Sequence, residues 1–276
     1  MRYPKITDWD DAYENPAHIP NAETIRKSWP KLANQFRKKL VKKSRAQLDI
    51  RYGKKPRNLL DIFLPEKKPK GLVVFIHGGY WRRFSKDIFS HLAQGALDKG
   101  YAVAMPSYTL CPDIKLSGIT KEVGGAINHA AKLIKGDIYI VGHSAGGHLA
   151  SRMICKNTPL KSSVQKRIQN TLSISGVSDL RPLLSINVND DLKLTAKEAN
   201  ADSPALLLPM KNAKLTCWVG MSERSEFIRQ NALLANIWHG LGADITLIEE
   251  QNTNHFTVVD GLMDSESDIV RQLLGS

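Results

Sequence analysis

The stretch DIYIVGHSAGGHLASRMI, residues 137–154, decides the fold of this chain. It opens on an apolar run, IYIV, which is typical of a central strand covered on both faces of a parallel sheet. Residues 145–156 carry a helical pattern. Between them lies GHSAG (142–146), whose flanking glycines allow a strand-to-helix turn so sharp that side chains would clash there. The stretch therefore predicts a strand, a tight turn and a helix in succession.

Ser144 is the residue that this turn presents. The turn projects its hydroxyl above the carboxyl end of the sheet, at the amino end of the helix, where the positive end of the helix dipole favours developing negative charge. A G-x-S-x-G sequence is common by chance, but one between a central strand and a helix is not. We therefore interpret Ser144 as a catalytic nucleophile rather than as part of a merely tight turn.

A second glycine-rich motif, HGGYW (77–81), follows the apolar run VVFI. Acyl transfer needs amide N–H donors aimed at the oxyanion of the tetrahedral intermediate, and a glycine pair lets the backbone approach the substrate closely. Gly78 and Gly79 are the candidate donors. The N–H of Ala145, the residue after the nucleophile, would complete an oxyanion hole.

Other side chains near these motifs have less specific roles. His77 is expected to hold its loop rather than to transfer protons. Tyr80 and Trp81 are candidate substrate-binding walls, although both would also fit as core aromatics. His148 lies one helical turn beyond Ser144 on a helix that leads away from the site, so we expect a structural role for it.

A serine hydroxyl needs a positioned base, and after this kind of turn the chain order is serine, then acid, then histidine. Only His239 and His255 lie far enough downstream. His239 belongs to an amphipathic helical stretch, whereas His255 follows the last expected strand in the polar loop QNTNHF. We therefore assign the base to His255.

The acid should follow the penultimate strand, where the loop reads GMSERSEF (220–227). A carboxylate there would accept the other imidazole N–H and stabilise the imidazolium. Glu223 is the preferred candidate. Glu226, and Asp179 after the preceding strand, remain alternatives.

The rest of the chain alternates short β-branched runs with longer helical patterns, which is typical of a parallel sheet with crossover helices. The sequence predicts an α/β fold with eight strands, the first two forming an antiparallel edge hairpin, at 46–52, 58–64, 71–76, 101–105, 137–141, 171–175, 215–219 and 244–249. Helices are expected at 21–43, 85–99, 120–135, 145–156, 224–241 and 262–274. We expect one domain, 1–276, with a helical N-terminal segment at about 1–45 and a small cap segment at about 178–210.

Composition excludes several other classes of protein. The 276 residues are 42% hydrophobic and 24% charged, as in ordinary globular proteins. The net charge of +12 resides mostly in short lysine clusters without interleaved aromatics, which favours a solvated surface over a nucleic-acid site. Three scattered cysteines exclude a disulfide framework and a zinc ribbon.

Localisation and partners follow from what the chain does not contain. Residues 1–11 do not resemble a signal peptide, and the longest apolar runs are too short to span a bilayer. We expect a cytoplasmic protein that acts on a small molecule without metal, organic cofactor, nucleic acid or membrane as a partner. A homodimer stays open.

Several motifs together resemble the arylformamidase-like branch of the α/β hydrolases, which includes kynurenine formamidases. The motifs are WDDAYENPAHIPNA (9–22), HGGYW (77–81), GHSAGGHLA (142–150), SGVSDLRPL (175–183), EFIRQ (226–230) and NHFTVVDGL (254–262). By position, the resemblance implies Ser144 as nucleophile, His255 as base, and Glu223, three residues ahead of the EF pair, as acid. Members of this branch mostly carry Asp at the acid position, and a bulkier residue where this chain has Ser178.

The resemblance implies hydrolysis of N-formyl-L-kynurenine to kynurenine and formate through an acyl-enzyme. A short-acyl carboxylesterase would share every catalytic residue and is the alternative. A hydrolase fold kept as a binding module without chemistry is a third, weaker hypothesis, because such a module need not keep nucleophile, base and oxyanion glycines together.

Overall fold

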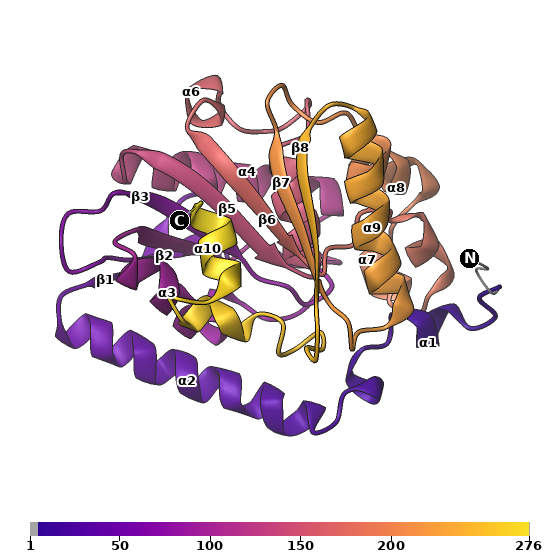
Figure 1. Ribbon diagram of the computed structural model, residues 1–276, viewed down its shortest axis with the longest axis horizontal. Coiled ribbons are helices and arrows are strands. Elements are labelled where there is room, and N and C mark those ends of the chain that lie inside the picture. Colours follow the sequence, from indigo (N-terminus) through magenta and orange to yellow (C-terminus); the bar gives the residue numbers. More distant parts are fainter. Residues whose placement is uncertain (1–4, 276) are drawn as a thin grey trace.

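Eight strands form a single sheet in the order β1-β2-β4-β3-β5-β6-β7-β8 in the computed structural model, which describes residues 5–275 (Figure 1). The strands β1 and β2 are antiparallel, β2 is antiparallel to β4, and all remaining pairs are parallel. The predicted eight-stranded sheet and its edge hairpin are confirmed. The bounds are β1 Ala46–Arg51, β2 Leu59–Phe63, β3 Gly71–Ile76, β4 Ala102–Pro106, β5 Asp137–His143, β6 Ile168–Ile174, β7 Lys214–Gly220 and β8 Asp244–Glu250.

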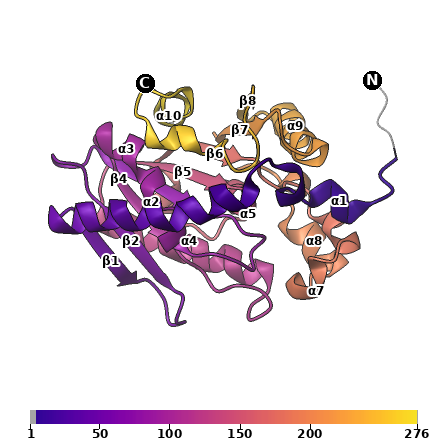
Figure 2. The same ribbon diagram turned by 90° about the horizontal axis from the view of Figure 1, so that it is seen from below.

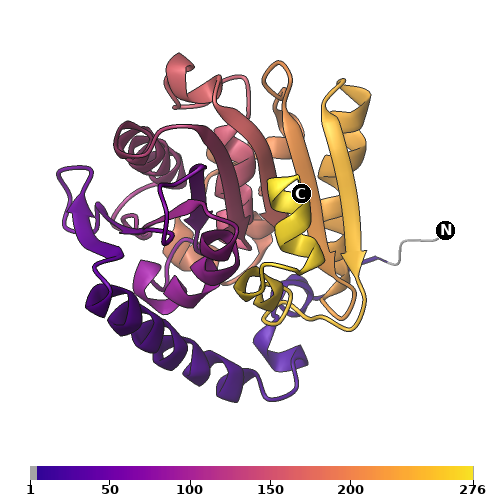
Figure 3. The ribbon, with the colours of Figure 1, turned by 60° about the vertical axis from the view of Figure 1, so that its left-hand side comes forward.

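Helices cover both faces of the sheet, as the apolar runs β3 and β5 require. One face packs against α2 (Ala22–Lys42), α3 (Gln94–Asp98) and α10 (Asp268–Leu274). The other packs against α4 (Leu116–Leu133), α5 (Ala145–Met153) and α9 (Ser225–Gly240). In Figure 2 the strands lie between α3 and α10 above and α4 below, and in Figure 3 α10 crosses in front of them. The short helix α6 (Ser162–Gln165) precedes β6.

Two predicted helices are interrupted. The span 85–99 is two 3-10 turns, 86–88 and 90–93, followed by α3, because Phe89 between them leaves the helical region at φ −117° and ψ 8°. The span 262–274 divides into a 3-10 turn at 260–263 and α10, whose start is set by Ser267: its hydroxyl accepts the N–H of Val270. Apolar spacing alone does not reveal such breaks.

Two segments meet at the carboxyl ends of the parallel strands. Residues 178–210, the expected cap, contain 3-10 turns at 181–185 and 204–206 and the short helices α7 (Asn189–Leu192) and α8 (Ala196–Asp202). The N-terminal segment contains α1 (Trp9–Tyr13) and a 3-10 turn at 16–18. The two segments touch, since Asn187 N–H donates to Asp10 Oδ1 at 2.7 Å. Residues 1–4 and 276 of the expected domain lie outside the described residues.

The turn after β5 leaves no space for side chains, which gives a stability test. A Cβ on Gly146 would lie 2.0 Å from the carbonyl oxygen of Ile76, so Gly146→Ala should lower the free energy of unfolding by more than about 4 kcal/mol or prevent folding. The matched control is Gly125→Ala in α4, where a Cβ meets nothing within 4 Å. That change should stabilise by about 0.5–1 kcal/mol. Urea unfolding checks both, and a Gly146→Ala protein as stable as the native one would contradict this packing.

Candidate active site

Ser144 occupies a strained turn between β5 and α5. Its backbone has φ 57° and ψ −120°, and its N–H donates to the carbonyl of Ile174 at 2.8 Å. A Cβ on Gly142 would lie 2.0 Å from the carbonyl oxygen of Gly146, and Gly146 itself abuts β3. Both glycines of the motif are therefore required by backbone contact. A strained, non-glycine residue held this firmly is a common feature of functional sites.

The loop after β3 lies directly against this turn. A Cβ on Gly78 would lie 2.8 Å from the His143 carbonyl oxygen and 3.1 Å from Ser144 Cβ, and Gly79 adopts φ 112°. In the described part of the chain, the N–H groups of Gly78, Gly79 and Ala145 donate no hydrogen bond. Gly78 lies against Ser144 and Ala145 follows it, so their free N–H groups, with that of Gly79, are candidate donors to an oxyanion.

His255 is held by Glu223. The Nδ1–H of His255 donates to Oε2 of Glu223 at 2.5 Å, which leaves Nε2 as the basic nitrogen. The other oxygen, Oε1, accepts from Ser175 Oγ at 2.5 Å and from Gly220 N–H at 2.9 Å. The Glu223 side chain is fully buried. This network fixes the imidazole in one tautomer and one orientation.

The two alternative acids have other partners. Glu226 receives two hydrogen bonds from Arg229, both at 2.8 Å, and one from the Tyr13 hydroxyl at 3.1 Å. Asp179 forms a two-pronged pair with Arg181 at 2.9 and 2.8 Å, and this pair lowers the pKa of Asp179 against the opposing effect of burial. Of the three candidates, Glu223 is the carboxylate that contacts His255.

The two aromatic residues of HGGYW have different surroundings. Tyr80 lines the cavity, and its hydroxyl donates to the carbonyl of Tyr13 at 2.7 Å, which ties the oxyanion loop to the N-terminal segment. Trp81, expected beside the substrate, is instead a fully buried core side chain packed edge-on against His148. Tyr80 and Trp81 both have left-handed backbone, at φ 48° and φ 53°, yet only Tyr80 lines the cavity.

The remaining predicted histidines have structural surroundings. His77 stacks on Tyr108 with ring centroids 4.3 Å apart, and its Nδ1 contacts the Gly78 carbonyl at 2.8 Å. His148 Nε2 contacts the carbonyl of Asp202 at 2.8 Å. His239 lies at the end of α9 and lines a separate groove beside β8.

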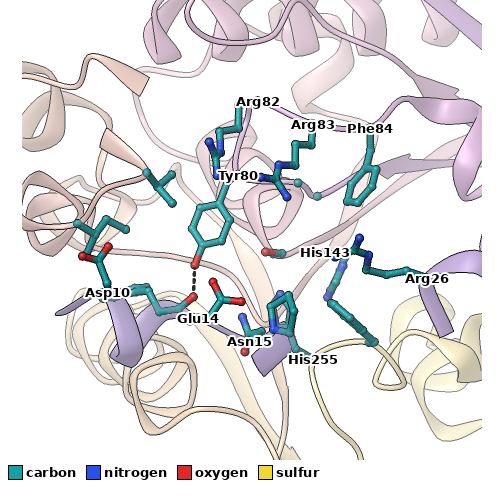
Figure 4. A pocket seen from close by; sticks show the side chains of 18 of the residues that line it. Asp10, Glu14, Asn15, Arg26, Tyr80, Arg82, Arg83, Phe84, His143 and His255 are labelled. Carbon is teal, nitrogen blue, oxygen red and sulfur yellow. Dashed lines mark hydrogen bonds between the residues drawn. The ribbon is translucent and has the colours of Figure 1, made fainter. Parts of the chain in front are cut away.

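A cavity of about 560 Å³ brings the site together. Its lining includes Ser144, His255, Gly78 and Gly79, and Figure 4 shows Tyr80 and His255 pointing into it. Aromatic rings supply much of the wall, from Tyr13, Trp29, Tyr80, Phe84, Phe89 and Phe256. The N-terminal segment contributes residues 10, 11 and 13–16. The cavity is thus enclosed by parts of the chain that are far apart in sequence.

Three contributors were missed by sequence reasoning. His143, within the nucleophile motif, packs against His255 with ring centroids 4.7 Å apart. Ser175, which supports Glu223, could have been suspected as the polar residue directly after the buried strand β6. Asn15 lines the cavity from the N-terminal segment, and nothing in the local pattern pointed to it.

Burial keeps the supporting histidines neutral. It lowers the pKa of His77 to about 4 and that of His148 to about 3. The pKa of His143 falls well below its usual value, because of burial first and the neighbouring His255 second. Desolvation disfavours a charged imidazole, so these rings act as neutral packing and hydrogen-bonding groups.

These shifts predict acid sensitivity. In the unfolded chain the histidines bind protons near about pH 6.5, but in the folded protein only at lower pH, so their contribution to stability is complete above about 6.5 and is lost as the pH falls toward 4. Each should add about 1.4 kcal/mol per pH unit to the slope of the unfolding free energy. Urea titrations between pH 7.5 and 4.5 measure this slope. His148→Gln should reduce it by the contribution of one histidine, about 1.4 kcal/mol per pH unit. A stability independent of pH across this range would contradict the neutral-histidine interior.

Neither a metal centre nor a membrane helix is apparent within residues 5–275. No group of three or more His, Cys, Asp or Glu side chains there could hold a metal ion. None of the helices described is long and apolar enough to cross a membrane.

The sharp serine turn above an eight-stranded, mostly parallel sheet defines the class of this protein as an α/β-hydrolase enzyme. Comparison with known families narrows the class further: the BD-FAE family model matches residues 60–255, and the chain belongs to this family.

Individual relatives agree with this assignment. The chain is 29% identical to kynurenine formamidase of Danio rerio, over 82% of this chain and 80% of the relative, and 28% identical to that of Salmo salar, over 94% and 91%. A crystal structure of a candidate thioesterase from Silicibacter sp. TM1040 superposes with a TM-score of 0.91 at 45% identity, covering 97% of this chain and 99% of that one. The resemblance to the arylformamidase-like branch is confirmed.

Proposed function

We propose that the protein is a serine hydrolase that works by two-step acyl transfer. Ser144 attacks the substrate carbonyl while His255 Nε2 takes its proton. The oxyanion is held by the N–H groups of Gly78, Gly79 and Ala145. His255 then protonates the leaving group and activates the water that releases the acid from the acyl-enzyme.

The observation that carries this proposal is the single cavity shared by Ser144, His255 and the glycine pair. The 2.5 Å contact from Glu223 supports the assignment of His255 as base, since a buried carboxylate stabilises the imidazolium that forms on proton transfer. Free N–H donors beside the serine support the oxyanion role, and each is worth about 3–4 kcal/mol of transition-state stabilisation in other enzymes.

The role of Glu223 predicts a specific defect. Glu223→Gln should lower kcat by roughly 10³–10⁴-fold, because an amide in its place favours the wrong imidazole tautomer. Glu226→Gln, the same chemical change three residues away, should retain most activity, since Glu226 contacts Arg229 and Tyr13 rather than His255. Steady-state kinetics on both purified variants would decide, and near-native turnover by Glu223→Gln would remove it from the mechanism.

For the substrate we infer an aryl formamide, N-formyl-L-kynurenine, which would yield kynurenine and formate. The aromatic walls supplied by Trp29, Phe84 and Phe256 suit an aryl ring, and the curated relatives named above are kynurenine formamidases. A carboxylesterase for short acyl groups is the alternative, because the same residues would cleave an ester.

The formamidase and the carboxylesterase functions can be distinguished by the substrate that the protein prefers. The native protein should hydrolyse N-formyl-L-kynurenine with a kcat/KM far above that for p-nitrophenyl acetate or an acetyl thioester, and Ser144→Ala should abolish all three activities. Confinement of activity to the ester, or to the thioester, would refute the formamidase proposal while leaving the serine mechanism in place.

A further inference from the structure

Asn15 is a buried polar residue of the cavity wall, and no contact within residues 5–275 accounts for its side-chain amide. Its side chain is only 3% exposed, and its Nδ2 has no hydrogen-bond partner in the part of the chain that the structure describes. It precedes the 3-10 turn at 16–18, where an asparagine side chain often caps, yet no such bond is formed. A buried donor without a partner costs about 1–3 kcal/mol. The unpaired Asn15 amide in the cavity wall therefore points to a ligand that accepts its hydrogen bond.

Two positive charges lie in the same cavity without a protein partner. Arg26 from α2 and Arg83 from the loop after β3 are exposed, and within residues 5–275 neither guanidinium forms an ion pair or hydrogen bond. Arg82 differs, because it pairs with Asp191. Figure 4 shows Arg26 and Arg83 reaching into the cavity from the side of Phe84, and Asn15 from the wall beside His255.

We propose that Asn15, Arg26 and Arg83 form a carboxylate-binding subsite that selects substrates bearing a carboxylate on the leaving group, the part of the substrate that is released when the acyl group is transferred to Ser144. Guanidinium and amide N–H groups are natural donors to carboxylate oxygens. The carboxylates of Asp10 and Glu14 line the same cavity, so they oppose the two charges of a phosphate dianion more strongly than the single charge of a carboxylate. The subsite deepens the function proposed above and rests on it for the choice of formamide substrate.

Matched substrate pairs test the subsite. N-formyl-L-kynurenine is compared with its carboxamide, and 4-acetoxybenzoate with 4-acetoxybenzamide, so that each pair differs only in the carboxylate. The native protein should prefer the acid of each pair by about tenfold or more in kcat/KM, with the preference falling as salt is added. Use of two pairs separates the proposals: activity on esters alone would refute the formamidase function, while the acetoxy pair still tests the subsite.

Variants assign the preference to its residues. Arg26→Gln and Arg83→Gln should each raise KM for the acids about three- to tenfold and leave the amides unchanged. Asn15→Asp, which places a negative charge at nearly constant shape, should abolish or reverse the preference. Lys27→Gln removes the same charge from the same helix, at a residue paired with Glu23 outside the cavity, and should change nothing.

Binding to the Ser144→Ala protein gives a readout independent of turnover. In calorimetry this protein should bind benzoate more tightly than benzamide. The Arg83→Gln change should remove this difference in affinity. Equal affinity for acid and amide, or variants that weaken both alike while keeping native melting temperatures, would overturn the proposal.

Discussion

The contact of Gly146 with the carbonyl of Ile76 is the constraint on which the rest of the site depends. It presses the start of α5 against the end of β3, and Gly78, two residues beyond Ile76, also packs closely on the carbonyl of His143. The proposed nucleophile and the proposed oxyanion loop are therefore aligned by backbone packing between adjacent parallel strands. No flexible side chain intervenes, so the alignment is as rigid as the sheet itself.

The buried titratable side chains around the site are either neutral or paired. His77, His143 and His148 are buried and neutral. Glu226 is paired with Arg229, and Asp179 is paired with Arg181. Glu223 is the carboxylate that contacts His255, and this contact supports the proposal that His255 transfers the proton. A low-dielectric surrounding strengthens this contact relative to water.

Much of the fold could be predicted from the sequence because its signals are local. The sharp turn at 142–146 needs glycine, and buried parallel strands need unbroken apolar runs, so Ser144 and the eight strands followed from short stretches. Chain order reduced the candidate bases to His239 and His255, and the helical pattern around His239 left His255 as the base. The sequence favoured Glu223 while leaving Glu226 and Asp179 open, and the resemblance pointed to the same residue.

What could not be predicted depends on contacts between distant segments. Asn15 and Arg26 precede the sheet by many residues, and only the folded chain brings them to the cavity of Ser144. Tyr80 and Trp81 are neighbouring aromatic residues of one loop, yet Tyr80 lines the cavity and Trp81 is buried in the core. Such outcomes follow from loop conformation, which apolar periodicity does not encode.

The central claim, that Ser144 is an activated nucleophile, is tested most directly by reaction with a fluorophosphonate followed by intact and peptide mass spectrometry. The account predicts one covalent adduct per chain, located on Ser144 and suppressed in the His255→Ala protein. No adduct on the folded native protein, or an adduct on a different residue, would contradict it.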